Sequence, residues 1–247
     1  MCAKRDLLLA AALLLCGWEI AALLLNSMAL PQPWQVLTEF GTELLSGRLL
    51  DDILISGLRA LAGVALGAVS AIPLGLLIGN EPALNRRLSP FIYLLYPMPH
   101  VVLLPLVIIL FGIGNLSKIV LIGVIIFFQI LVTTRDASRD IPPNYLYSLQ
   151  TLGAGSWQLY CHVILPATLP KILTALRISI GTAVAILFFV ESFATTRGLG
   201  YLIMDSWGRA DYIALYSAIT GMALLGFGLY LLLDRLERRF CPWNHLE

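Results

Sequence analysis

Residues 144–171 read NYLYSLQTLGAGSWQLYCHVILPATLPK, and the interpretation of the whole chain starts from this stretch. It is the longest segment in the second half of the chain that is too polar to lie in lipid. The sequence on both sides of it is apolar enough to cross a bilayer. Its pattern predicts two short amphipathic helices, which are separated by residues 153–156 and closed by Leu165 and Pro166. Such a segment is more typical of a docking surface than of a plain connection.

The composition indicates a membrane protein. Of the 247 residues, 59% are hydrophobic and only 13% are charged, and the mean hydropathy is +0.86. Soluble domains carry about 25% charged residues, so this chain has too few to cover a surface that faces water. Its apolar residues fall in runs of about 20, which as helices cross a hydrocarbon core of about 30 Å. The predicted fold class is an all-α polytopic membrane protein.

Six transmembrane helices are predicted, in one domain that covers residues 1–247. They span about residues 6–30, 53–78, 90–111, 116–134, 172–194 and 213–233. Residues 136–171, called the elbow below, connect the fourth span to the fifth. The first apolar run is far longer than the ~7–15 residues of a signal peptide, so it is interpreted as a retained helix.

Local patterns refine these spans. Residues 36–50 predict a short helix on the outer surface, residues 80–87 a polar loop, and residues 202–212 a short outer segment. The second span is rich in small residues, which let helix backbones approach closely in lipid. Asn115 or Ser117 is expected to cap the fourth helix.

The third span is the first choice for lining a pathway. Prolines lie at positions 90, 97, 99 and 105, and each interior proline removes a backbone hydrogen bond and kinks the helix. A broken helix at membrane depth is tolerated where it meets protein or a cavity. His100 in this span contacts either solute or its own packing neighbours.

The basic residues orient the chain. Ten of them (Lys4, Arg5, Arg86, Arg87, Arg135, Arg139, Lys171, Arg235, Arg238, Arg239) fall on the side of both termini, against four (Arg48, Lys118, Arg197, Arg209) on the other. This asymmetry follows the positive-inside rule and predicts a cytoplasmic elbow and cytoplasmic termini in an inner membrane. The basic residues are dispersed over loops, so no nucleic-acid partner is expected.

The sequence carries no sign of an enzyme. It has no Walker motif, no catalytic-triad pattern and no metal-ligand spacing, and its four cysteines form no CxxC pair. No cofactor is therefore expected in this chain, and the chain has no energy source of its own. A cytoplasmic elbow can transmit force from a separate ATPase subunit into the helices.

The elbow resembles the cytoplasmic loop of permease subunits of bacterial ABC importers. That loop follows the pattern Glu-Ala-Ala, three residues, Gly, nine residues, Ile, one residue, Leu-Pro. Gly153, residues 154–162 and the sequence Val163-Ile164-Leu165-Pro166 match this spacing. The flanking TLGAGSWQLYCHVILPATLPKILTALRI, the later ESFATTRGLGYLI and the earlier PFIYLLYPMPHVVLLPLVIILFGIGNLSK are similar to the nitrate/sulfonate/taurine branch, so the resemblance covers most of residues 56–216. Tyr147-Ser148-Leu149 depart from Glu-Ala-Ala.

The resemblance implies an importer with two permeases, two ATPase subunits that bind ATP and Mg²⁺, and an outer substrate-binding protein. A homodimer of permeases is favoured over a pair of related chains. The elbow would dock on the ATPase through the following residues: Leu146, Tyr147, Leu152, Gly153, Ala154, Gly155, Ser156, Trp157, Leu159, Tyr160 and Pro166. Gly153 and Gly155 would supply the turn. Trp157 and Tyr160 would either anchor the ATPase or pack on the chain's own helices.

The substrate path is less defined by sequence. Candidates for lining or gating it are Pro97, Pro99, His100, Gln129, Glu191 and Ser192. Glu191 matches an acidic position of the family's fifth span, and Arg197, Arg177 or a second subunit are its expected partners. The solute is expected to be small and anionic, and sulfonates, taurine, nitrate, bicarbonate, cyanate and aromatic or pyrimidine precursors all stay open.

Two other functions compete with an ABC permease. An ion-coupled secondary transporter would need a coupling carboxylate within the membrane, and its usual inverted repeat is not evident here. A membrane-embedded enzyme would need catalytic residues that share one depth, and no such set is present in the sequence.

Overall fold

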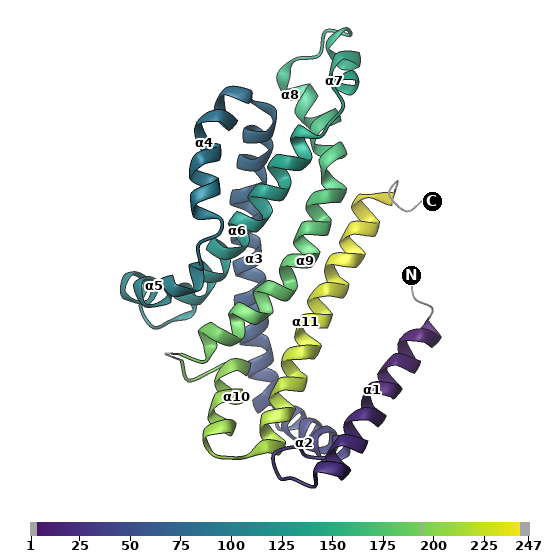
Figure 1. The fold of residues 1–247 in the computed structure, drawn as a ribbon, viewed down its shortest axis with the longest axis vertical. Helices are drawn as coiled ribbons and strands as arrows, with labels where there is room; N and C mark the ends of the chain where they lie inside the picture. Colours follow the sequence, from purple (N-terminus) through teal and green to yellow (C-terminus); the bar gives the residue numbers. More distant parts are fainter. Residues whose placement is uncertain (1–3, 194, 243–247) are drawn as a thin grey trace. The chain divides into compact units, whose positions relative to one another are not determined.

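The computed structural model describes residues 4–193 and 195–242, and every regular element within these ranges is helical (Figure 1). In chain order the elements are α1 (Lys4–Leu25), α2 (Pro33–Leu45), α3 (Arg48–Asn80), α4 (Pro82–Leu95), the 3-10 helix η1 (His100–Leu103), α5 (Leu104–Phe111), α6 (Asn115–Arg139), α7 (Pro143–Gln150), α8 (Ser156–Leu159), the π-helix η2 (Tyr160–Ile164), α9 (Leu165–Glu191), α10 (Leu199–Gly208) and α11 (Tyr212–Phe240). The predicted all-α fold class is confirmed.

Several helices are long and apolar enough to cross a membrane. Four pass this test alone: α3, α6, the continuous run Ser156–Glu191, and α11. The pair Pro82–Leu95 and His100–Phe111 passes it together, with a bend of 79° between the two helices. These elements overlap the predicted second to sixth spans. The apolar part of α1 is the shorter segment Leu9–Leu25, so a total of six spans stays a prediction.

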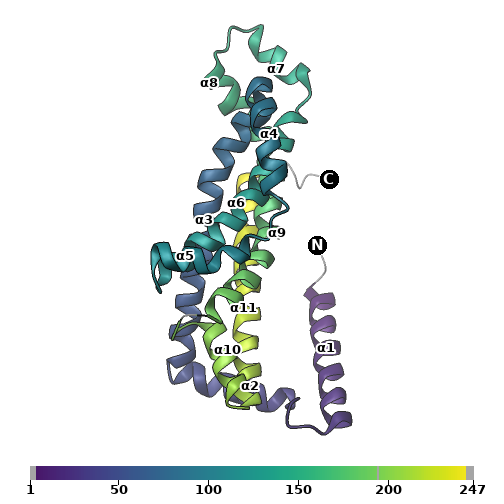
Figure 2. The ribbon, with the colours of Figure 1, turned by 60° about the vertical axis from the view of Figure 1, so that its left-hand side comes forward.

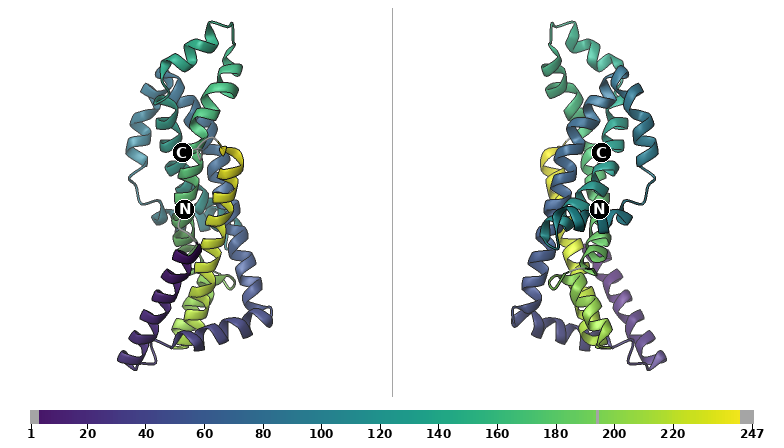
Figure 3. Two further views of the ribbon diagram at one scale, coloured as in Figure 1. Left: turned by 90° about the vertical axis from the view of Figure 1, so that its right-hand side faces the viewer. Right: turned by 90° about the vertical axis from the view of Figure 1, so that its left-hand side faces the viewer.

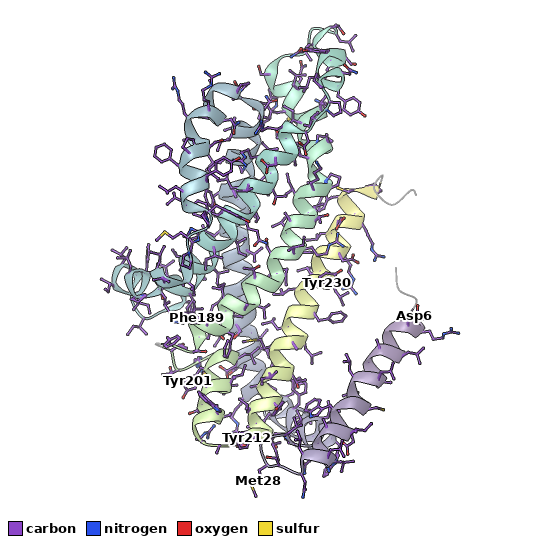
Figure 4. All side chains as sticks on the ribbon, in the orientation of Figure 1. Asp6, Met28, Phe189, Tyr201, Tyr212 and Tyr230 are labelled. Atoms are coloured by element: carbon purple, nitrogen blue, oxygen red, sulfur yellow. The ribbon has the colours of Figure 1, made fainter. Side chains whose placement is uncertain are left out.

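The chain folds into two compact units. Unit 1 comprises the residues up to Ser56 together with Glu191–Leu225, and unit 2 comprises Gly57–Val190 together with the residues from Gly226. In unit 1, α2 joins the end of α1 to the beginning of α3 (Figure 3). Figure 4 places Met28 in the connection before α2 and Tyr212 at the beginning of α11. In unit 2, α7 and α8 lie beyond the adjoining ends of α6 and α9 (Figure 2).

A seam of glycines brings α3 close to α6 in unit 2. A Cβ atom added to four α3 glycines would lie too close to α6 atoms: Gly63 at 2.5 Å from the Ile122 side chain, Gly67 at 2.9 Å from the Gly123 carbonyl, Gly75 at 2.7 Å from Thr134 Cβ, and Gly79 at 2.4 Å from the Arg135 carbonyl. The small residues predicted to allow close approach therefore do so along one face of α3.

The elbow is anchored to unit 2 by a buried apolar cluster. Leu76, Ile141, Ile164 and Ile172 form its centre, and partly buried side chains of Ile72, Leu146, Tyr160, Val163 and Leu176 pack against it. The Tyr160 hydroxyl also accepts a hydrogen bond from the Asn80 amide at 3.3 Å. Both arms of the elbow thus contact the helices that they join.

The structure corrects three local predictions. Residues 80–87 are not a loop, because α3 continues to Asn80 and α4 begins at Pro82, a favoured first helical residue. Neither Asn115 nor Ser117 caps α6, whose N-cap is Gly114. The Ser117 hydroxyl donates instead to the Gly114 carbonyl, and the Asn115 side chain accepts from the Arg59 guanidinium.

The third correction concerns the end of the elbow. The second elbow helix was predicted to close at Leu165 and Pro166, but helical residues run without a break from Ser156 to Glu191. The Leu165 amide donates to the Tyr160 carbonyl in a π-type bond, directly before the proline that has no amide hydrogen. This wider turn lets the helix pass Pro166 where a regular turn would clash with its ring.

Candidate functional site

The turn of the elbow is built around Gly153. This residue has φ of +81°, the left-handed conformation that costs glycine least. The Gly153 amide donates to the Gln150 carbonyl at 2.9 Å and the Ala154 amide donates to the Leu149 carbonyl at 3.2 Å. Together these two bonds form a Schellman motif that ends α7. The predicted turn role of Gly153 therefore has a specific backbone cause.

Gly155 has a different part in the turn. Its φ of −75° and ψ of 168° are extended, and it is the N-cap of α8. Its amide donates to the Gln158 side-chain oxygen at 2.8 Å, which satisfies one of the free amides at the helix start. Any residue can adopt this conformation, so only Gly153 of the two requires glycine.

Three large side chains of the turn are exposed. Trp157 is 79% exposed, Leu152 83% and Tyr147 61%. Side chains of α7 and α8 project from this end of unit 2 in Figure 4. Leu146 and Tyr160, by contrast, pack on the apolar cluster of the chain itself. The two expected anchors thus differ, since Trp157 is free to contact a partner and Tyr160 packs internally.

The other elbow residues predicted to contact the ATPase differ in their exposure to solvent. Gly153, Gly155 and Ser156 are exposed, and Ala154, Leu159 and Pro166 are half-buried. Pro166 lines a shallow cavity with Tyr145, Ser148, His162, Val163 and Ala167. No Asp, Glu, Lys or Arg occurs between positions 142 and 161. The exposed turn is therefore an uncharged, aromatic-bearing surface.

A cavity of about 420 Å³ lies at the break between α4 and η1. It gathers three of the predicted path residues, namely Pro99, His100 and Gln129, with other lining residues from α6 and α9. Pro97 belongs to the same break but is not part of the lining, and neither are Glu191 and Ser192. The structure thus shows that residues of the proline break, α6 and α9 line one cavity, a proximity that could not be predicted from the sequence.

Glu191 organises a polar cluster in unit 1 instead. Its carboxylate is fully buried and lies 2.9 Å, at both oxygens, from the donating Ser56 hydroxyl. The Gly200 amide also donates to it at 2.9 Å. The same Ser56 oxygen accepts from the Leu199 amide, and Asp52 accepts from the Gly198 amide at 2.6 Å. The carboxylate therefore holds the segment that follows α9.

The contributions of Ser56, Asp52, Gly198 and Gly200 were missed by sequence reasoning. Ser56 is 135 residues from Glu191 in the chain, and no local pattern links them. Gly198 did carry a signal, since a glycine after a buried acidic residue is consistent with close backbone approach. A Cβ on Gly198 would lie 2.6 Å from the Glu191 carboxylate, and its φ is +115°.

Arg177, one of the partners expected for Glu191, has other partners in unit 2. Its guanidinium pairs with the carboxylates of Glu237 and, at 3.7 Å, Asp234 on α11. It also lies 6.0 Å from the centre of the Tyr230 ring, a residue labelled in Figure 4. This ion pair links α9 to α11, so the expectation that Arg177 balances Glu191 is wrong.

Metal ligation has no candidate in the described part of the chain. No group of three or more His, Cys, Asp or Glu side chains there is arranged to hold an ion. Cys16 and Cys161 are accessible free thiols and Cys241 is a buried one. The described residues of the elbow, the cavity and the Glu191 cluster therefore act through packing and hydrogen bonding.

Comparison with known proteins gives the family. A family model described as "binding-protein-dependent transport system inner membrane component" matches residues 71–242. The taurine transport system permease protein TauC of Escherichia coli (strain K12) is 33% identical over 240 residues, which cover 95% of this chain and 87% of that protein. The putative aliphatic sulfonates transport permease protein SsuC of Bacillus subtilis (strain 168) is 30% identical, with coverage of 96% and 87%.

A solved structure supports the same fold. The MetNI methionine ABC transporter, in an inward-facing conformation, contains a chain that matches with a TM-score of 0.69. The sequence identity is 21%, and the match covers 80% of this chain and 98% of that one. The all-helical fold is thus the fold of a type I ABC importer permease. Sequence and fold together show that this chain is a multi-pass member of the family of inner membrane components of binding-protein-dependent transport systems.

Proposed function

We propose that the chain is the permease of an ATP-driven importer for a small anionic solute of the sulfonate, taurine or nitrate kind. In this proposal two permeases, favoured as two copies of this chain, form the translocation path. Two ATPase subunits bind ATP and Mg²⁺ and hydrolyse the nucleotide, and a substrate-binding protein delivers the solute from outside. The termini and the elbow lie in the cytoplasm.

The observation that carries this proposal is the exposed turn of the elbow. Gly153 fixes a tight turn at the end of unit 2, and Tyr147, Leu152 and Trp157 are exposed around it. Exposed aromatic and apolar side chains on a rigid scaffold are typical binding anchors. An ATPase groove that receives this turn would move α6 and α9, because the elbow joins these two helices and packs on them. Nucleotide-driven closure would then shift the population of inward- and outward-facing states.

Two observations support the solute class. Relatives that are 30–33% identical over most of this chain include permeases named for taurine and for aliphatic sulfonates. The cavity at the break of α4 and η1 has no Asp or Glu among its lining residues. A wall without carboxylates does not repel an anion.

The test is transport by the assembled complex. The chain would be co-expressed with the ATPase and substrate-binding protein of its transport system, and reconstituted in vesicles with ATP on the ATPase side. We expect ATP-dependent uptake of labelled taurine, ethanesulfonate or nitrate. Gly153→Trp should abolish both uptake and substrate-stimulated ATP hydrolysis, and Gly155→Ala, at an unstrained position, should retain both. Wild-type rates in Gly153→Trp would exclude coupling through the elbow.

An ion-coupled secondary transporter is the second candidate, since Glu191 is a fully buried carboxylate. Its bonds to Ser56 and Gly200 favour a structural role, because a coupling carboxylate must exchange its proton or ion. Uptake that survives ATP depletion but collapses when ionophores dissipate the proton or sodium gradient would favour this alternative.

A further inference from the structure

Two cavities of unit 2 meet at one side chain. The cavity at the proline break is lined by Gln129 of α6 and Thr182 of α9 together with His100. A second cavity, of about 360 Å³, is lined again by Gln129 and also by Thr133, Thr174 and Lys171. Gln129 thus lines both cavities, and the other polar residues named above come from α6, α9 and, for His100, η1. We call these six polar residues the α6–α9 stripe.

The chemistry of the stripe is that of neutral hydrogen-bond donors. Gln129, Thr174 and Thr182 each carry an amide or hydroxyl that can donate, whereas the Thr133 hydroxyl already donates to the Gln129 carbonyl at 3.0 Å. Neither cavity has an Asp or Glu in its lining. The only formal charge is that of Lys171 at one end, which also pairs with the exposed Asp140 at 2.9 Å. The stripe therefore suits an uncharged or anionic solute that offers oxygen acceptors.

His100 at the other end of the stripe has an unsatisfied nitrogen. The residue is only 8% exposed, and its ring stacks on Phe128 with ring centres 4.6 Å apart. Nε2 is buried without a hydrogen-bond partner among the described residues. An unpaired buried polar group is destabilising, so a hydrogen-bond partner gained during the transport cycle would stabilise the protein.

We propose that the α6–α9 stripe is the wall along which this chain contacts its solute, and that it selects small oxyanions through neutral donors. This inference rests on the proposed function and names the residues that act on the solute there. Neutral donors bind an oxyanion more weakly than arginine does. A path needs such weak, repeated sites, because a solute must leave each one to be transported.

Cysteine labelling tests the accessibility and charge preference of the stripe without requiring uptake. Gln129→Cys and Thr182→Cys would be placed separately in a cysteine-free version of the assembled transporter. Each would be treated with an anionic sulfonate-bearing or a cationic ammonium-bearing methanethiosulfonate reagent. The ratio of anionic to cationic rate would be normalised to that of Leu45→Cys, which is 91% exposed at the end of α2 and lies outside the proposed ATPase contact. We expect a normalised preference for the anionic reagent of about fivefold or more at both positions. No reaction, or a cationic preference, would overturn the proposal.

Uptake of ethanesulfonate gives the functional test. Loss of two donors in Gln129→Leu/Thr182→Val should lower the rate of uptake per assembled complex about tenfold, with the amount of assembled complex measured separately by size-exclusion chromatography. Thr220→Val is the matched control, because Thr220 is also half-buried but bonds to the Tyr216 carbonyl of its own helix α11. A wild-type rate of uptake per assembled complex in the double variant, or an equal loss in Thr220→Val, would overturn the assignment. Failure of the wild type to take up solute with ATP would instead contradict the proposed function, whatever the labelling result.

Discussion

At the scale of single residues, Gly153 is the position where backbone conformation and proposed function coincide. A Cβ there would meet no atom within 4 Å, so a substitution acts through the positive φ and through any partner that approaches the turn. Alanine at such a position costs roughly 1 kcal/mol or more, whereas asparagine tolerates the left-handed region better. The two substitutions therefore separate strain from contact.

We expect Gly153→Ala to lower ATP-coupled uptake through loss of the Schellman turn. If only the turn matters, Gly153→Asn should transport at nearly the wild-type rate, and if the ATPase packs tightly on this backbone, Gly153→Asn should fail as well. Initial uptake rates with the two variants would be compared with Gly155→Ala, whose backbone is extended. Normal uptake by Gly153→Ala would contradict a need for this turn.

Glu191 is the second residue at which a substitution has a predictable effect, here on the stability of the fold. Glu191→Gln keeps the shape but replaces one acceptor oxygen by a donor that faces the Ser56 hydroxyl and the Gly200 amide. We expect the free energy of unfolding to fall by about 1–3 kcal/mol, measured as a lower thermal midpoint of the purified protein in detergent. Ser70→Ala, which removes an exposed hydroxyl bonded within its own helix, should leave the midpoint unchanged.

At the scale of elements, the glycine seam of α3 is the most demanding contact. Gly79→Ala would place a Cβ 2.4 Å from the Arg135 carbonyl, which belongs to backbone that cannot rotate away. We expect a loss of about 1–3 kcal/mol from overpacking. Gly181→Ala in α9 meets nothing within 4 Å and should be neutral or stabilising by up to about 1 kcal/mol. Equal midpoints for the two variants would show that α3 and α6 do not pack this closely.

Much of the element order could be predicted from the sequence, because it depends on local rules. Hydrophobic runs predicted the long helices, and the four prolines of the third span predicted a broken helix. The 79° bend falls at residues 96–99, whereas Pro90 lies within the continuous helix α4. The predicted end of the elbow helix at Pro166 was wrong, because a π-helical turn before Pro166 lets the helix continue. This turn depends on backbone hydrogen bonds that cannot be predicted from residue types. Long-range partners were also hidden: neither the Ser56–Glu191 bond nor the ion pair of Arg177 with α11 follows from local spacing.

At the scale of the whole molecule, the basic residues predict one orientation in the membrane. Leu152→Cys in the elbow and Leu45→Cys at the end of α2 are exposed positions on opposite sides in this prediction, 83% and 91% exposed. In a background without other accessible thiols, and with the permease expressed without its ATPase so that the elbow is uncovered, an impermeant reagent added to intact cells should label only Leu45→Cys. After permeabilisation it should label both. Cys241 should react slowly at neutral pH in either case, because burial raises the pKa of its thiol. Labelling of Leu152→Cys in intact cells would reverse the orientation.

Assembly with the ATPase gives the last prediction, and it follows from the uncharged turn. No Asp, Glu, Lys or Arg occurs between positions 142 and 161, and Tyr147-Ser148-Leu149 stand where the family pattern has Glu-Ala-Ala. Docking should therefore depend on shape and apolar area, which salt does not screen. We expect the Kd for the ATPase to change by less than about threefold between about 50 and 500 mM salt.

Removal of the exposed aromatic anchor should have a much larger effect. Trp157→Ala is expected to weaken binding by about 2 kcal/mol, or roughly 30-fold in Kd, because its ring would be buried only in the complex. Tyr160→Phe is the control, since Tyr160 packs inside the chain and loses only its bond to Asn80. Binding measured by sedimentation or interferometry on the purified proteins distinguishes docking through the apolar turn from docking through charged residues. A steep loss of affinity with salt, together with a small effect of Trp157→Ala, would show that charges outside this turn control docking.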